Sequence, residues 1–136
     1  LCFTITYSQE QIDGFRGWKW GTPLEDVKSQ LKKSSNKLPG FAAYDKIEED
    51  LTFEGLKARS ITYGFKKKAL KAVNIGLKNA DLNKIVEIFT KKYGEPKKTE
   101  TPFFTNWEWH LTTADISIAY FPSKKEDGVT IGIKGK

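Results

Sequence analysis

Two stretches of the chain repeat apolar residues at the spacing of an amphipathic helix. The apolar positions of the first stretch are Leu24, Val27 and Leu31. Before them, Thr22 offers an N-cap hydroxyl, Pro23 suits the first helical position, and Glu25 completes a capping box. The pattern predicts a first helix that begins at Pro23 and ends near Lys33.

The second stretch has a longer apolar stripe, made of Leu82, Ile85, Val86, Phe89 and Tyr93. Asn79 or Asp81 can cap its start, Gly94 suits the position just after its last turn, and Pro96 follows as a helix stop. A second helix is therefore predicted up to Tyr93.

Elsewhere, apolar residues alternate with polar ones, which is typical of strands with one buried face. Strands are predicted at 58–66, 70–78, 103–113, 115–121 and 129–134, with a shorter one near 51–54. Lys67-Lys68 makes the tip of the first hairpin. The order predicts an α+β fold over 15–136: a duplicated αβββ-type unit with two helices packed on one face of a mostly antiparallel sheet.

Two pairs of tryptophans stand two positions apart, so both rings of a pair point to one side of an extended chain. The pairs are Trp18 with Trp20 and Trp107 with Trp109. They can form an aromatic platform for a ligand or belong to the core. Their phase with neighbouring apolar residues favours the core.

The opposite face of the predicted sheet consists almost entirely of small or short polar residues. Interior strand glycines often mark the close approach of another chain, so this face is the predicted binding surface. The candidate residues are Thr62, Gly64, Asn74, Gly76, Glu108, His110, Ser117, Thr130 and Gly132. The alternative is an ordinary solvent face whose glycines permit curvature.

Charge and composition narrow the possible functions. The net charge is +6, with one His and one Cys, which leaves too few ligands for an ordinary structural zinc site, and no cofactor or metal is expected. The segments 1–68 and 69–136 each carry +3, and only Arg16 and Arg59 are arginines. A basic nucleic-acid-binding domain is thus an alternative, which the even spread of charge and the scarcity of arginine do not favour.

Glu108 and His110 lie two apart on the same predicted face and could perform acid–base chemistry. A hydrolase-like enzyme is therefore a further alternative to two exposed polar side chains. Dinucleotide, P-loop and nucleophile-elbow motifs are absent from the sequence. The prediction is a non-enzymatic binding module whose partner is a protein or a small ligand.

The N-terminal segment, 1–14, has two main interpretations; a third, a lipidated Cys2, is disfavoured by Leu1, because bacterial lipoprotein signals have a small residue before the cysteine. Residues 1–7 are apolar and uncharged, and Ser8 before Gln9 resembles a cleavage site, as at the end of a signal peptide. Phe3, Ile5 and Tyr7 also alternate like a first strand. The signal interpretation implies a bacterial periplasmic or secreted protein. No apolar run reaches the ~18 residues of a membrane span.

Two segments carry a resemblance to known proteins: Trp20-Gly21-Thr22-Pro23-Leu24-Glu25-Asp26-Val27, and Tyr93-Gly94-Glu95-Pro96. They resemble the helix-then-hairpin plan of outer-membrane assembly small lipoproteins and β-lactamase-inhibitor-protein-like modules. The segment 15–21 also resembles a Phe-x-Gly-x-x-Trp-Gly opening of secreted bacterial proteins. The resemblance implies an envelope setting and binding rather than catalysis. It assigns no functional residue, and the chain lacks a cysteine pair and a good lipobox.

Overall fold

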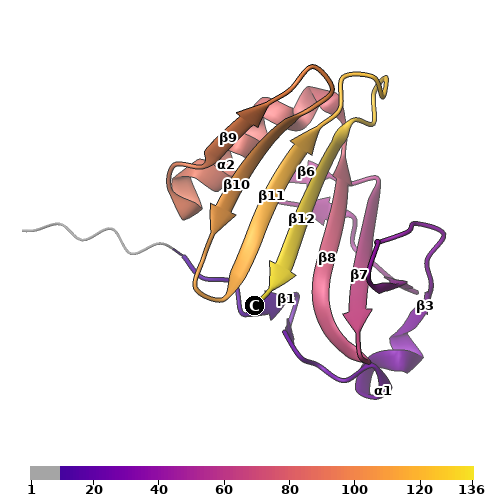
Figure 1. The fold of residues 1–136 in the computed structure, drawn as a ribbon. Coiled ribbons are helices and arrows are strands. Elements are labelled where there is room, and N and C mark those ends of the chain that lie inside the picture. Colours follow the sequence, from indigo (N-terminus) through magenta and orange to yellow (C-terminus); the bar gives the residue numbers. More distant parts are fainter. Residues whose placement is uncertain (1–9) are drawn as a thin grey trace, which may run out of the picture.

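Eight antiparallel strands form one sheet in the computed structural model, which describes residues 10–136 (Figure 1). The order across the sheet is β3 (Leu31–Lys33), β4 (Ala42–Lys46), β7 (Ser60–Lys66), β8 (Ala69–Leu77), β12 (Val129–Gly135), β11 (Ala114–Tyr120), β10 (Thr105–His110) and β9 (Lys97–Glu100). The predicted signal peptide or first strand at 1–8 lies outside the described residues.

The strands follow the helices in two sets. Helix α1 (Leu24–Val27) precedes β3, β4, β7 and β8, and helix α2 (Leu82–Tyr93) precedes β9 to β12. The last strands of the two sets, β8 and β12, pair at the centre of the sheet. The α+β class with a large antiparallel sheet is confirmed, whereas duplication of a three-stranded unit is not. The edge strands β3 and β9 were not predicted. They carry exposed lysines, which protect a sheet edge from pairing with other chains, and they lack the apolar alternation that indicates a strand.

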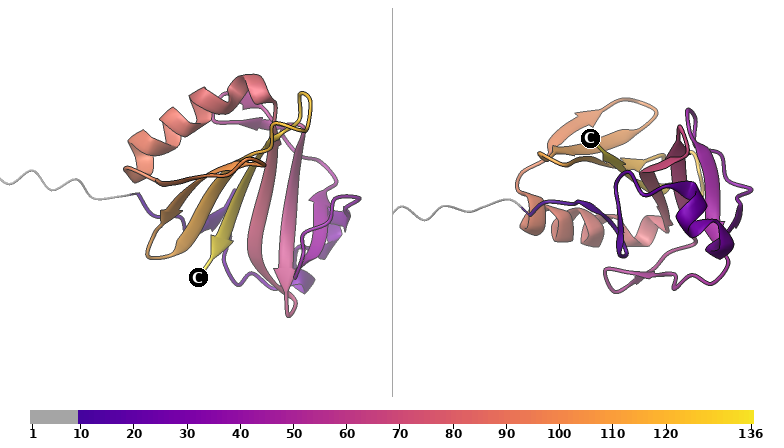
Figure 2. Two further views of the ribbon diagram at one scale, coloured as in Figure 1. Left: turned by 45° about the horizontal axis from the view of Figure 1, so that its top comes forward. Right: turned by 90° about the horizontal axis from the view of Figure 1, so that it is seen from below.

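Helix α2 matches its predicted course and covers part of one sheet face (Figure 2). Its stripe buries Ile85, Phe89 and Tyr93, and Gly94 ends it with a φ of 93°. The Phe89 ring packs edge-on against Trp109, with ring centres 5.7 Å apart. Asn79 does not cap the helix: its side chain bonds the β11–β12 loop, accepting from the Gly128 amide at 2.6 Å.

The first helix is much shorter than predicted. After α1 the chain makes a single 3₁₀ turn, η1 (Lys28–Gln30), and Leu31 then enters edge strand β3, paired with Lys46. Pairing with β4 therefore overrides the helical spacing of Leu31. Thr22 caps nothing, since its hydroxyl donates to the Lys19 carbonyl at 2.6 Å. Helix α1 lies beside the β7–β8 turn, where the Leu24 amide donates to the Lys68 carbonyl, so packing of both helices on one face is not confirmed.

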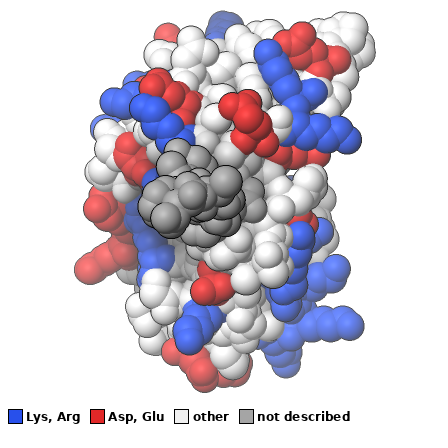
Figure 3. All heavy atoms as spheres, turned by 90° about the vertical axis from the view of Figure 1, so that its left-hand side faces the viewer, with Lys and Arg blue, Asp and Glu red and all other residues white. Residues whose placement is uncertain are grey.

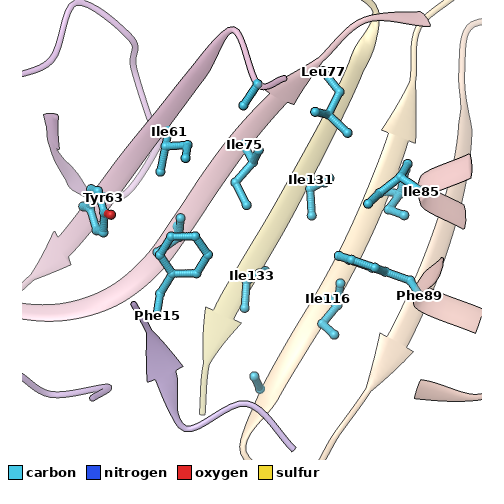
Figure 4. Close-up of a cluster of buried hydrophobic side chains, with 14 of the residues drawn as sticks. Phe15, Ile61, Tyr63, Ile75, Leu77, Ile85, Phe89, Ile116, Ile131 and Ile133 are labelled. Atoms are coloured by element: carbon cyan, nitrogen blue, oxygen red, sulfur yellow. The ribbon is translucent and has the colours of Figure 1, made fainter. Parts of the chain in front are cut away.

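The core lies between the inner face of the sheet, α2 and two small hairpins (Figure 4). These hairpins are β1 (Gly14–Phe15) with β2 (Trp18–Lys19), and β5 (Thr52–Phe53) with β6 (Leu56–Lys57). Ile61, Ile75, Ile131 and Ile116 point from four neighbouring strands toward it. All four tryptophans pack in or against this core, with Trp109 fully buried, as the phase of the pairs predicts.

Residues 10–13 are attached to the same body. The Glu10 amide donates to the Lys92 carbonyl at 3.3 Å, and the Trp20 indole donates to the Ile12 carbonyl at 2.9 Å. Within residues 10–136, no helix is long and apolar enough to span a membrane.

Candidate functional site

The nine candidate residues lie on the face of the sheet opposite the core, hereafter the outer face. Strand pairing places them in rows across the sheet. One row is Glu108, Ser117, Gly132, Asn74 and Thr62. A second row is His110, Asp115, Lys134, Ala72 and Gly64, and a third includes Asn106, Ala119, Thr130 and Gly76.

Part of this face is covered by the chain itself. The loop 34–41 between β3 and β4 folds over β7, so a Cβ added to Gly64 would lie 3.1 Å from Leu38 Cδ1 and 3.2 Å from Phe41 Cβ. Asn36 of the same loop donates to the Thr62 hydroxyl at 3.3 Å, and Thr62 is only 2% exposed. The prediction that Thr62 and Gly64 form an open binding surface is therefore wrong.

Gly76 is covered by Arg59. A Cβ at Gly76 would lie 2.7 Å from the Arg59 Cζ atom. The guanidinium is fixed there, because it donates to the carbonyls of Leu77 and, at 3.0 Å, of Val129. Gly76 is thus buried beneath the exposed side chain of Arg59, and the prediction that it is an open contact residue is also wrong.

Another part of the outer face forms an open groove of about 350 Å³. Its floor is Asn74, Ser117 and Gly132, with Lys134 beside them; one wall is Leu38, Pro39 and Phe41; the opposite wall is Glu108, His110 and Asp115. Five of the nine candidate residues therefore line one groove. Thr130 lies on the same face, outside this groove.

The polar wall is a chain of contacts centred on His110. Its Nδ1 lies 2.8 Å from Asp115 Oδ1, and its Nε2 lies 3.5 Å from Glu108 Oε2. The other Glu108 oxygen accepts a hydrogen bond from the Asn106 amide at 2.7 Å. Lys136 Nζ lies 3.3 Å from Asp115 Oδ1. Neighbouring strands β10 and β11 hold these groups, because His110 pairs directly with Asp115 in the ladder.

The ionisation of Asp115 decides which imidazole nitrogen carries the proton. Partial burial raises the pKa of Asp115, but hydrogen bonds from His110 and Lys136 outweigh it and hold this pKa below its usual value. An ionised carboxylate only accepts, so Nδ1 carries the hydrogen. In the neutral imidazole, Nε2 is then an acceptor that faces the Glu108 carboxylate.

The apolar wall was not predicted from sequence. Leu38 and Phe41 flank a Pro39-Gly40 turn, and Gly40 has a φ of 87°. Lys66 and Lys134 hold their ammonium groups 6.0 and 5.8 Å from the centre of the Phe41 ring. In the sequence, only the two apolar residues Leu38 and Phe41 in an otherwise polar loop could have indicated this wall. They do not indicate which face of the sheet the loop covers.

The described part of the chain contains no group of three or more His, Cys, Asp or Glu side chains able to hold a metal ion. No protein-family model matches the chain, and comparisons with curated proteins and with solved structures also gave no match. The resemblance carried by 15–21 and by the two helix boundaries therefore stays a prediction.

Proposed function

We propose that this protein is a non-enzymatic binding module that holds a segment of another protein in the outer-face groove. One observation carries the proposal: short floor residues lie between an apolar wall and a charged wall, and the groove between them stays open although the chain covers Thr62, Gly64 and Gly76 on the same face. Open concave sites with an apolar lining and a few convergent polar groups are the usual form of binding sites.

The groove offers complementary contacts to a polypeptide. Leu38, Pro39 and Phe41 can pack an apolar or aromatic side chain of the partner. Gly132 lets a partner backbone approach the sheet closely, since Ser117 Oγ, at 3.2 Å, is the nearest atom to its missing Cβ. Asn74 and Ser117 then provide hydrogen bonds, and the charged wall orients the ligand.

The test fills the floor of the groove without touching the core. Ser117→Phe places a ring in the groove, and Thr99→Phe on exposed edge strand β9 is the matched control. A protein captured from native extract by the parent chain is purified, and its affinity for each variant is measured by calorimetry. We expect Ser117→Phe to weaken binding at least about 100-fold, because it occupies the partner's pocket, and Thr99→Phe to leave it unchanged.

Thermal melting of each variant verifies that it is folded. Equal affinity for Ser117→Phe and the parent chain, with both folded, would remove the groove as the binding surface. The same variants separate a nucleic-acid binder, whose affinity for DNA or RNA falls steeply with salt and is set by lysines rather than by Ser117. The side of the molecule in Figure 3 carries both basic and acidic side chains.

One observation favours a second candidate, acid–base catalysis by Glu108 and His110. Asp115 orients the imidazole as an orienting carboxylate does in catalytic sites. Among the described residues, however, no hydroxyl donates to His110 Nε2. Equal hydrolysis of p-nitrophenyl acetate by the parent chain and His110→Ala would remove this candidate.

Export to the bacterial envelope is a separate part of the proposal. The apolar run 1–7 followed by Ser8 supports it. N-terminal sequencing of the protein recovered from its source would give Gln9 as the first residue; retention of 1–8 would contradict export by this route.

A further inference from the structure

We infer that Glu108 and His110 form a two-ligand site for a late first-row divalent cation such as Zn²⁺, with Asp115 as the carboxylate behind the histidine. The site lies in the polar wall of the groove, and it does not depend on what occupies the groove.

The spacing of the two acceptor atoms fits chelation. His110 Nε2 and Glu108 Oε2 are 3.5 Å apart, which is long for a hydrogen bond. A tetrahedral zinc ion with ordinary Zn–N and Zn–O bonds would separate its nitrogen and oxygen ligands by about 3.4 Å. The two atoms therefore stand at about the separation that one ion would bridge.

The surroundings of the imidazole are those of a metal ligand. A ligating histidine usually donates its second ring N–H to a carboxylate, which fixes its tautomer and ring orientation. Asp115 accepts from Nδ1 at 2.8 Å, so Nε2 carries the free lone pair. The 59% exposed side chain of His110 leaves that lone pair accessible.

Two neighbouring side chains of the site are already engaged. The Asn106 amide holds Glu108 Oε1 at 2.7 Å and leaves Oε2 to face the imidazole. Lys136 is held by Asp115 and by the Leu111 carbonyl at 2.6 Å. Because the protein supplies only two ligands, water or a donor group of the bound partner would occupy the other coordination positions. The affinity of the protein alone for zinc is therefore modest.

The test is a titration of the full chain with ZnCl₂, followed by calorimetry. All proteins carry Cys2→Ser, so that the single thiol cannot bind the metal. We expect one zinc ion per chain, a loss of binding of about tenfold or more in Glu108→Gln and Asp115→Asn, and no binding in His110→Ala. Glu100→Gln, an exposed acid paired with Lys98 on β9, is the matched control and keeps full affinity.

A second readout identifies the nitrogen. The ¹⁵N chemical shift of His110 Nε2 should move on zinc addition while Nδ1 keeps its proton. Absence of binding at millimolar zinc, or equal binding by Glu108→Gln and the control, overturns the inference. Partner binding is measured separately in EDTA, so failure of the metal site and failure of the proposed groove function are distinguishable.

Discussion

The hydroxyl of Tyr63 donates a 2.6 Å hydrogen bond to Oε1 of Glu49. The other Glu49 oxygen lies 3.1 Å from the Arg16 guanidinium, which also donates to the carbonyls of Asp50 and Thr52. A central strand, the 47–52 segment and the β1–β2 hairpin are thereby joined through one carboxylate. Burial of Tyr63, together with Glu49, raises the pKa of the phenol far above its usual value.

Replacement of Glu49 should destabilise the protein. Glu49→Ala removes an acceptor shared by Arg16 and a fully buried phenol, so we expect the free energy of unfolding to fall by about 1–3 kcal/mol. Urea unfolding of Glu49→Ala, Tyr63→Phe and the double variant gives the coupling between them. Glu48→Ala, the exposed neighbour, is the control, and an equal effect of both alanines would contradict the role of Glu49.

Two glycines of the outer face should respond differently to alanine. Gly76→Ala must displace Arg59, so we expect a loss of about 1–3 kcal/mol, and a much smaller loss when Arg59 is already alanine. Gly132→Ala meets only the Ser117 hydroxyl and should change stability by less than about 0.5 kcal/mol. Chemical unfolding of the four variants measures this, and equal losses at Gly76 with and without Arg59 would show that the contact is unimportant.

Stability should fall in alkaline solution, and Tyr93 is, with Tyr63, one of the two tyrosines responsible. Burial, with the nearby carboxylates of Glu10 and Glu54, raises the pKa of Tyr93 to about 12 in the folded protein, while an unfolded tyrosine ionises near ~10. The stabilisation is therefore complete below about pH 10 and is lost as the pH rises toward 12. Urea midpoints measured between pH 8 and 11 give the slope of stability against pH. This slope should be shallower in Tyr93→Phe than in the parent protein. Identical slopes in both proteins would exclude Tyr93 as a cause.

Trp109 should be the more sensitive member of its pair. Its ring is 2% exposed, and its indole donates to the Gly94 carbonyl at 2.7 Å, at the end of α2. Trp109→Phe leaves a cavity and an unpaired carbonyl, so we expect a loss of about 2–4 kcal/mol. Trp107→Phe is the comparison. Because Trp107 is only half-buried, its substitution should lower the free energy of unfolding by less. A larger fall in melting temperature for Trp107→Phe than for Trp109→Phe would contradict this prediction.

Helix α2 and the central hairpins were predictable because local pattern and tertiary packing agree there. The stripe of α2 faces the core, and Lys67-Lys68 form the β7–β8 turn with φ values of 51° and 63°. Leu31 shows the opposite case. It has the spacing of a helical residue, but it lies in edge strand β3, where it pairs with Lys46 of β4. Strand β4 also escaped prediction, although its Tyr44 packs edge-on against Phe65 in the core layer.

By itself, the sequence determined which residues face the core and which share the outer face, because a period of two fixes the side of every residue in a strand. It could not tell which small residues receive the chain's own side chains. Thr62, Gly64 and Gly76 are covered by the 34–41 loop and Arg59, whereas Asn74, Ser117 and Gly132 line the groove. Only the tertiary structure decided this, because the path of a loop and the reach of a long side chain depend on contacts between residues far apart in the chain.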